Sequence, residues 1–354
     1  DEVKMHFQIR FPKLGEMSNE WESAVKNAKS DQSFDRFWKA LFENTNSNLE
    51  YPVFEEGSVI ATRKAFGATL DKFAEQVPNI VGGSADLEPS NYTTNFAHKY
   101  GDFSKENKLG RNLAFGVREF PMAAAMNGIA LHGGLIPFGG TFLVFADYER
   151  PALRLASIQK CGVIHEFTHD SFWVGEDGPT HQPVEQAMSL RAIPGFNVFR
   201  PADAKETVAS FKLAMNNKTS PSALLLTRQG VPVLNQPIDE IIEGVGRGAY
   251  IVVEENSPEL VFLATGSEVS LAMDVASNMT DKRVRVVSMP CWEIFEDQPQ
   301  SYKESVIPVR GAMKISFEAG ITLGWDKYIG SNGLSIGIDH FGASAPGKHL
   351  AEEF

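Results

Sequence analysis

One acidic residue, Glu119, stands between an apolar segment and a helical pattern built from small residues. Residues 113–117 are typical of a short buried strand, and residues 121–134 are typical of a tightly packed helix. We therefore expect Glu119 at a strand-to-helix junction, where parallel α/β sheets bind ligands. A buried carboxylate there is paired, protonated or hydrogen-bonded to something specific, such as a ligand. The alternative is a structural role, either an ion pair with Arg111 or Arg118 or an acidic residue favoured by the helix N-terminus.

The polar loop over residues 168–183 follows another apolar segment and contains His169 and His181 among three acidic residues. This position favours a functional site in which histidine acts in acid–base chemistry or binds hydroxyl groups. With His165, these histidines could be zinc ligands, but the spacing matches no strong metal pattern and we expect none. The alternative is a structural turn held by the side chains of Asp170 and Asp177.

Three aromatic residues, Phe142, Phe145 and Tyr148, recur at intervals of three. This spacing places them on one side of a predicted helix and is usual for core residues. The preceding Gly139 and Gly140 allow a backbone to approach a ligand closely, so a flat ring bound against the aromatics is the alternative.

Two arginines, Arg63 and Arg228, each lie beside an apolar segment. Such arginines usually line a solvated rim. If they converge with Ser90 and His169, they form a fork-type site suited to a phosphate dianion.

Residues 264–270 contain a single glycine, which is too weak a signal for a phosphate loop, and we interpret them as a fold-defining turn.

Apolar strand patterns alternate with amphipathic helices, which predicts an α/β fold with a parallel sheet followed by a smaller α/β unit. We expect a connecting arm over residues 1–57, a first domain over 58–230, a linker over 231–247 rich in Pro, Gly and acidic residues, and a second domain over 248–354. The predicted strands are residues 80–86, 113–117, 135–138, 163–168, 198–200 and 222–227, then 249–253, 260–264, 284–288 and 313–317.

The composition restricts the class of protein. The chain has 354 residues, 43% of them hydrophobic, and a formal net charge of −12, which argues against general binding to nucleic acid or an anionic membrane. Cys161 and Cys291 are far apart, so we expect no disulfide framework and a reducing, cytoplasmic compartment. The chain begins at Asp1 without a methionine, and we expect it to be a fragment.

Taken together, a series of motifs closely resembles the transketolase family in order and spacing. The resemblance covers the pyrimidine-binding and C-terminal domains of that family, and the N-terminal domain, which binds the diphosphate and its metal, has no counterpart. The motifs are residues 61–64, 82–87, 89–91, 116–119, 139–143, 168–171, 175–183 (Gly-Glu-Asp-Gly-Pro-Thr-His-Gln-Pro), 200–203, 264–269 and 341–344.

The resemblance implies transfer of a two-carbon ketol unit between sugar phosphates with thiamine diphosphate, in a homodimer, with Mg²⁺ or Ca²⁺ held by the N-terminal domain and no metal ligand in this chain. Glu119 would hydrogen-bond the aminopyrimidine and favour the imino form, whose nitrogen removes the thiazolium C2 proton. The resemblance further implies that Phe142, Phe145 and Tyr148 hold the pyrimidine, Asp86 lies near the cofactor across the dimer interface, His181 and Asp177 contact sugar hydroxyls, and Arg63, Ser90, His169 and Arg228 bind the phosphate.

Two pairs depart from the family pattern: Phe120-Pro121 where the family usually has His-Ala, and Phe172-Trp173 where it usually has a small pair such as Ile-Gly. Phe120 removes a possible proton carrier, and Trp173 adds bulk near the substrate channel. Two alternatives stay open. One is another thiamine enzyme, such as a deoxyxylulose phosphate synthase or the β subunit of a 2-oxoacid dehydrogenase, and the other is a non-catalytic assembly module.

Overall fold

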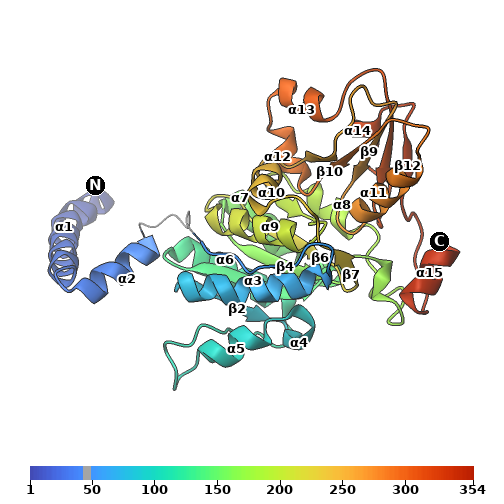
Figure 1. Ribbon diagram of the computed structural model, residues 1–354. Coiled ribbons are helices and arrows are strands. Elements are labelled where there is room, and N and C mark those ends of the chain that lie inside the picture. The colour runs from blue at the N-terminus through green and yellow to red at the C-terminus, as the bar shows by residue number, and fades with distance from the viewer. Residues whose placement is uncertain (43–48) are drawn as a thin grey trace. The chain divides into compact units, whose positions relative to one another are not determined.

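The computed structural model describes residues 1–42 and 49–354. The chain divides into two compact units, Asp1–Thr45 and Asn46–Phe354. The smaller unit contains two helices, and the larger unit contains two five-stranded sheets with their helices (Figure 1).

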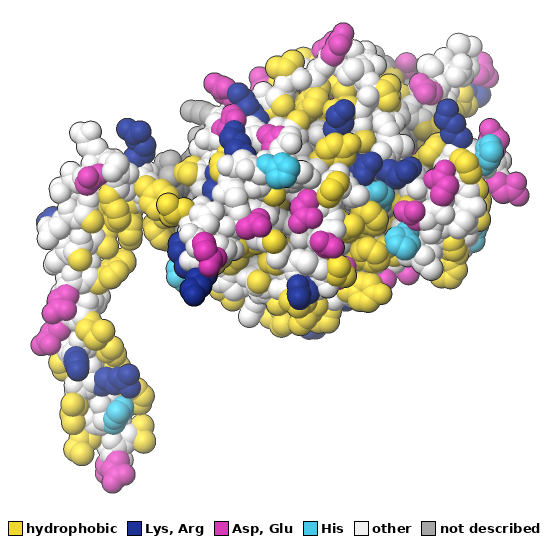
Figure 2. Space-filling view, turned by 90° about the horizontal axis from the view of Figure 1, so that it is seen from below, with side chains coloured by type: hydrophobic (Ala, Val, Ile, Leu, Met, Phe, Trp, Pro, Cys, Tyr) yellow, Lys and Arg dark blue, Asp and Glu magenta, His cyan; other side chains and the backbone are white. Residues whose placement is uncertain are grey.

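The smaller unit consists of α1 (Glu2–Ala28) and α2 (Gln32–Phe42). The rings of Trp21 in α1 and Trp38 in α2 lie 6.0 Å apart, and Trp38 also packs on Phe42 at 4.7 Å. No residue of α1 is buried, and hydrophobic side chains lie along its length (Figure 2). The two helices of this unit therefore pack on each other through aromatic rings.

The first sheet of the larger unit is parallel throughout, with the strand order β2-β3-β4-β6-β5. Parallel neighbours need crossover connections, and helices supply most of them. The strands are β2 (Ile80–Ser84), β3 (Ile136–Phe142), β4 (Ile164–Thr168), β5 (Asn197–Phe199) and β6 (Ser222–Leu226). The helices are α3 (Thr62–Gln76), α4 (Glu88–Asn91), α5 (Thr94–Tyr100), α6 (Glu119–His132), α7 (Ala146–Gln159), α8 (Gln186–Arg191) and α9 (Ala204–Asn216), with 3₁₀ turns η1 (Leu143–Phe145) and η2 (Phe172–Val174).

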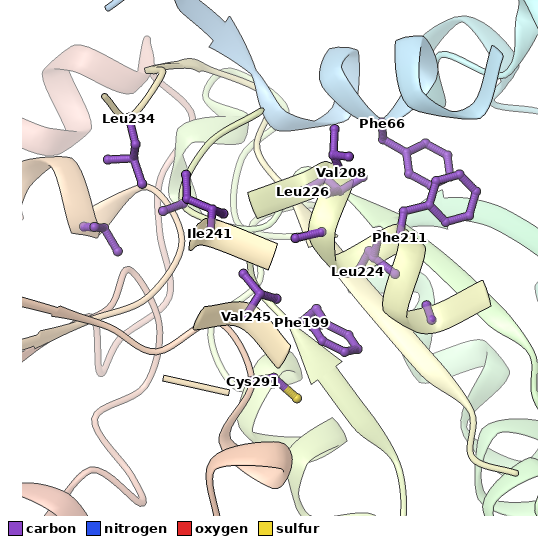
Figure 3. Close-up of a cluster of buried hydrophobic side chains, with 14 of the residues drawn as sticks. Phe66, Phe199, Val208, Phe211, Leu224, Leu226, Leu234, Ile241, Val245 and Cys291 are labelled. Carbon is purple, nitrogen blue, oxygen red and sulfur yellow. The ribbon is translucent and has the colours of Figure 1, made fainter. Parts of the chain in front are cut away.

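Successive residues of β6 face opposite sides of this sheet. Leu224 lies in a core with Phe66 of α3 and Phe211 of α9, whose rings are 4.8 Å apart (Figure 3). Leu225 lies in a separate core with Leu153 of α7. Because strand side chains alternate with a period of two, helices cover both faces of the sheet.

The second sheet has the order β12-β11-β9-β10-β8 and is parallel except for β8. The second sheet and its helices pack against the first sheet near Cys291, which precedes α12. Phe199 of β5 and Cys291 form an isolated bridge there, within one hydrophobic core (Figure 3). A short antiparallel pair joins β1 (Val59–Ala61) and β7 (Gly230–Pro232). The remaining elements are β8 (Tyr250–Val253), β9 (Leu260–Ala264), β10 (Val284–Ser288), β11 (Met313–Phe317), β12 (Leu334–Ile336), α10 (Ile238–Gly246), α11 (Glu268–Asn278), α12 (Trp292–Glu296), α13 (Gln300–Val306), α14 (Asp326–Ile329) and α15 (Gly347–Glu353).

The predicted fold class is confirmed: a parallel α/β sheet is followed by a second α/β unit. Residues 113–117 are not a strand: Gly116 has φ 64°, and in this region only the preceding Asn112 forms isolated bridges, with Gly82 and Asp102. Within the segment expected to be a linker, the structure contains α10, whose Ile241 and Val245 are fully buried.

Across residues 1–42 and 49–354, none of the helices combines the length and apolar character needed to cross a bilayer.

Candidate active site

The predicted site residues lie at the carboxyl ends of the first sheet's strands, in the loops that follow them, and at the starts of α3, α4, α6 and α7. Ligands of open parallel sheets bind at this edge. Phe142 ends β3, and His169 directly follows β4. Asp86 and Ser90 follow β2, and Arg228 follows β6.

Arg63, Ser90 and His169 meet in one cluster. The Nη1 atom of Arg63 donates to the carbonyl oxygen of Ser90 at 2.9 Å and to Nε2 of His169 at 3.4 Å. The guanidinium also lies 5.3 Å from the centre of the Tyr92 ring. Three of the four predicted phosphate-binding residues are therefore in direct contact.

The imidazole of His169 has a defined tautomer and is neutral. Because a guanidinium has only donors, Nε2 of His169 accepts from Arg63, and Nδ1–H donates to Oγ1 of Thr168 at 2.8 Å. Burial, with the charges of Arg63, Arg228 and His181, lowers the pKa of His169 to about 3. The backbone of His169 has φ 62°, a left-handed conformation that is uncommon outside glycine and occurs at functional sites.

The fourth predicted residue, Arg228, is exposed, and its position follows from a pair of buried threonines. The backbone N–H of Thr62 donates to Oγ1 of Thr227 at 2.9 Å, and the N–H of Thr227 donates to Oγ1 of Thr62 at 2.7 Å. This exchange of hydrogen bonds holds the segments of Arg63 and Arg228 side by side. Burial lowers the pKa of Arg63, Tyr92 opposes this, and the charge of Arg228 lowers the pKa further. Two cations with a neutral imidazole make a site that fits an anion.

The aromatic residues do not share one helix, contrary to the prediction. Phe142 ends β3, Phe145 ends η1, and Tyr148 lies in the first turn of α7. The rings of Phe142 and Phe145 are nevertheless parallel within 6° at 5.8 Å, and Phe145 lies 6.0 Å from Tyr148. The ring of His181 packs edge-on against Phe145 at 5.6 Å, and that of His169 lies 3.8 Å from Phe142. Through the contact of His169 with Phe142, the cluster of Arg63, Ser90 and His169 adjoins the three aromatic residues.

Glu119 opens α6 and is half-buried rather than buried. Arg111 donates to the carbonyl oxygens of Ile80, Ala74 and Val77, and Arg118 donates to that of Phe115. Within the described part of the chain, no ion pair involves Glu119, which excludes the structural ion pair with either arginine. Its carboxylate is available to a ligand.

The structure does not bring Asp86 and Asp177 into contact with the other site residues. Asp86 is exposed and has φ 64°, and Asp177 is exposed in its loop. Asp170 in the same loop is buried and pairs with Arg200, 2.9 Å from Nε to Oδ2. The predicted turn is therefore not held by both aspartates.

Buried charges tie the histidine loop to the second sheet. Arg200, which is 1% exposed, pairs with Asp170 and with Glu268, and Glu318 lies 3.8 Å away. Burial opposes the charge of Arg200, but these three carboxylates raise its pKa. The turn at residues 264–267 must contain glycine, because a Cβ at Gly266, with φ 62°, would lie 2.8 Å from the guanidinium.

The two pairs that depart from the family pattern lie in different surroundings. Phe120 is exposed in the first turn of α6. Phe172 stacks on Trp173 at 5.2 Å and contacts Phe354 at 5.6 Å, so this pair packs against the region of α15.

Sequence reasoning missed two buried carboxylates near the site, Glu149 and Glu166. Glu149 lies 3.0 Å from Nδ1 of His165, and burial raises its pKa, with Glu119 adding to the effect. Glu166 adjoins the Arg63 cluster. The signal available in the sequence was the pair His165-Glu166 inside an otherwise apolar strand.

In residues 1–42 and 49–354, no three His, Cys, Asp or Glu side chains are grouped to hold a metal ion.

Two family matches cover most of the larger unit. Residues 58–233 match the family described as transketolase, pyrimidine binding domain, and residues 248–354 match the transketolase-like TK C-terminal domain. The transketolase of Halalkalibacterium halodurans is 51% identical over 306 residues, or 86% of this chain and 46% of that protein. The chain thus spans about half the length of the curated relatives it matches.

Solved structures agree with these matches. Transketolase from Leishmania mexicana superimposes with a TM-score of 0.91 and 41% identity over 100% of this chain and 52% of that chain. A split-gene transketolase, described as an inactive β4 tetramer, has a TM-score of 0.65 and 24% identity over 83% of this chain and 93% of that one. The similarity to the split-gene protein concerns the fold alone.

Proposed function

The chain belongs to the transketolase family, and from that premise we propose that it supplies the pyrimidine-binding and C-terminal half of a ketol-transferring enzyme. The enzyme would move a two-carbon unit from a ketose phosphate to an aldose phosphate. We assign residues 58–230 and 248–354 to these two domains, joined by 231–247 and preceded by an arm over 1–57.

The observation that carries the proposal is the cluster of Arg63, Ser90 and His169 beside Arg228. Its cations suit a phosphate dianion, and the neutral imidazole of His169 accepts from Arg63 through Nε2 and so helps to hold the guanidinium in place. We propose that these four residues bind the substrate phosphate and that His181 and Asp177 contact the sugar hydroxyls.

The residues around Glu119 fit the pyrimidine of thiamine diphosphate. A flat ring matches the parallel rings of Phe142 and Phe145 with Tyr148 beside them, and a half-buried carboxylate without an ionic partner matches a ring nitrogen. When bound, the cofactor supplies the nucleophilic carbon and electron sink for breaking a carbon–carbon bond next to a ketone. In this chain, Glu119 would hold the proton at the pyrimidine nitrogen, and His181 would exchange protons with the substrate hydroxyl beside that bond.

The other half of the site would come from partners. The chain spans about half the length of its relatives, which supports an N-terminal half that holds the diphosphate with Mg²⁺ or Ca²⁺. Exposed apolar side chains on α6 and α7, including Phe120, Leu131 and Leu155, support a homodimer in which Asp86 reaches the cofactor of the partner. The free, buried Cys161 and Cys291 support a cytoplasmic location.

The test is a reconstitution. The chain is assayed for ketol transfer from xylulose 5-phosphate to ribose 5-phosphate with thiamine diphosphate and Mg²⁺, first alone and then with the N-terminal half of the Halalkalibacterium halodurans transketolase. We expect activity only in the second case. Activity of the chain alone would contradict the need for a second half, and no activity in either case, despite a soluble complex, would contradict the catalytic assignment.

A further inference from the structure

A buried carboxyl group, that of Glu166, lies near the anion-binding cluster and has no hydrogen-bond partner in the described part of the chain. Glu166 is 0% exposed in the middle of β4. Among the residues that the structure describes, none donates a hydrogen bond to either carboxyl oxygen. Nε of Arg63 is also buried without a partner. A buried ionised carboxylate with no donor is strongly disfavoured.

The neighbours of Glu166 leave room for the group but do not bind it. Gly140 of β3 pairs with Glu166 of β4 and leaves space for its carboxyl group, because a Cβ at position 140 would lie only 2.7 Å from Oε2 of Glu166. The amide nitrogen of Asn91, close to the same place, already donates to the carbonyl of Thr141 and to Oγ1 of Thr168. The neighbour on β6 is the apolar Leu224.

The charges that face Glu166 are those of the anion site. Burial raises the pKa of Glu166 well above its usual value, and among the described residues only the charge of Arg63 on α3 opposes this by favouring the ionised form. His169, which follows β4, is neutral, Arg228 is exposed beyond it, and β3 and β6 present the uncharged Gly140 and Leu224. The opposite face of β4 carries His165, which pairs with Glu149 and not with this cluster.

We propose that Glu166 determines the specificity of the site for a dianion by remaining a neutral acid near Arg63. The inference rests on the proposed phosphate site. With Glu166 neutral, Arg63 and Arg228 present two positive charges, which match a phosphate dianion. With Glu166 ionised, one of those charges is cancelled, and a carboxylate stands close to the bound anion. The site then loses affinity for dianions as the pH rises, because binding requires uptake of a proton by Glu166.

The test measures binding of sulfate, which stays a dianion throughout the range, so that any dependence on pH comes from the protein. The 354-residue chain is titrated with sulfate in a calorimeter from about pH 6 to about pH 9. We expect the affinity to fall by about tenfold or more across the titration of Glu166, with uptake of a proton visible as a dependence on the ionisation enthalpy of the buffer. The isosteric variant Glu166→Gln should bind sulfate with an affinity that hardly changes with pH.

Two further variants separate the possible outcomes. Glu149→Gln, which alters the buried carboxyl on the opposite face, should keep the pH profile of the unaltered chain, and Arg63→Gln should lose most of the binding. An unchanged pH profile in Glu166→Gln would overturn the inference, as would a gain in affinity at every pH, which would mean a permanently ionised carboxylate. If the unaltered chain bound no sulfate, or bound it equally well after Arg63→Gln, the phosphate site itself would be wrong, which would overturn the inference too.

Discussion

The two ends of the proposed site differ in how many of their contacts come from this chain. At the phosphate end, Arg63 contacts Ser90 and His169, His169 is 4% exposed, and Thr62 and Thr227 hold the two segments together. At the cofactor end, Glu119 has no ionic partner within the described residues, and Tyr148 is 66% exposed. In the proposed enzyme, substrate recognition would therefore depend mainly on residues of this half, whereas the cofactor end would need surfaces supplied by another domain or chain.

This difference has a physical reason. A cluster that contains a half-buried guanidinium and a buried neutral imidazole is stable only when most of its polar atoms have partners, so most of those partners belong to the same folding unit. A carboxylate at the first turn of a helix, by contrast, is stabilised by the helix N-terminus and by solvent until a ligand arrives. Variants at the two ends should accordingly have separable effects.

The largest expected effect is that of Glu119→Gln on the reconstituted enzyme. Removing the carboxylate should lower kcat by about a hundredfold to ten-thousandfold, the range that acid–base groups contribute. Sulfate binding by the chain should not change, because the phosphate end does not use Glu119. Glu240→Gln, an exposed acid in the first turn of α10, is the control, and near-normal turnover of Glu119→Gln would show that the carboxylate has no such role.

A second variant, Arg200→Met, should make the phosphate end incomplete. It leaves Asp170, Glu268 and Glu318 buried without their shared cation, so the free energy of unfolding should fall by about 3–5 kcal/mol, measured by denaturant titration. Sulfate affinity should fall as well, because Asp170 adjoins His169 in the chain. Arg247→Met, which removes an exposed pair with Glu243, should cost only about 0.5 kcal/mol. Equal losses in both variants would contradict the importance of the buried network.

A third change, Arg63→Met, tests recognition without chemistry. Loss of a charge-assisted hydrogen bond should raise KM for sugar phosphates by about tenfold to a hundredfold in the reconstituted enzyme. Turnover of a ketose without a phosphate should stay the same, and Arg63→Lys should recover only part of the loss, since an ammonium lacks the fork geometry. A parallel loss with both kinds of ketose would place Arg63 outside phosphate recognition.

The sequence predicted the elements whose pattern is local. The strands β9, β10 and β11 were predicted with the bounds that the structure has, because each is a short segment rich in apolar residues. Residues 113–117 have the same pattern but form no ladder, since strand formation depends on a neighbour that the sequence does not identify. The helical repeat of α10, at Ile238, Ile241, Ile242 and Val245, was hidden among Pro, Gly and acidic residues.

The site was predictable only in part, because its contacts join distant residues. The resemblance provided Arg63, Ser90 and His169, and the fold brings them together. The interval of three between Phe142, Phe145 and Tyr148 did not distinguish one helix from a strand end followed by a 3₁₀ turn and a helix. The position of Glu166 beside Gly140 follows from the pairing of β4 with β3, which no local pattern reveals.

The smallest expected effect is that of Tyr148→Ala on the chain by itself. Its ring is mostly exposed, so the free energy of unfolding should change by no more than about 0.5 kcal/mol. Phe142→Ala, which removes a ring that is 8% exposed and packs on His169, should cost about 3–5 kcal/mol in the same denaturant titration. In the reconstituted enzyme, however, Tyr148→Ala should weaken the binding of thiamine diphosphate, because the ring then has a ligand to contact. A large loss of stability in the isolated chain would mean that Tyr148 already has its partners there, and the distinction between a finished phosphate end and an unfinished cofactor end would not hold.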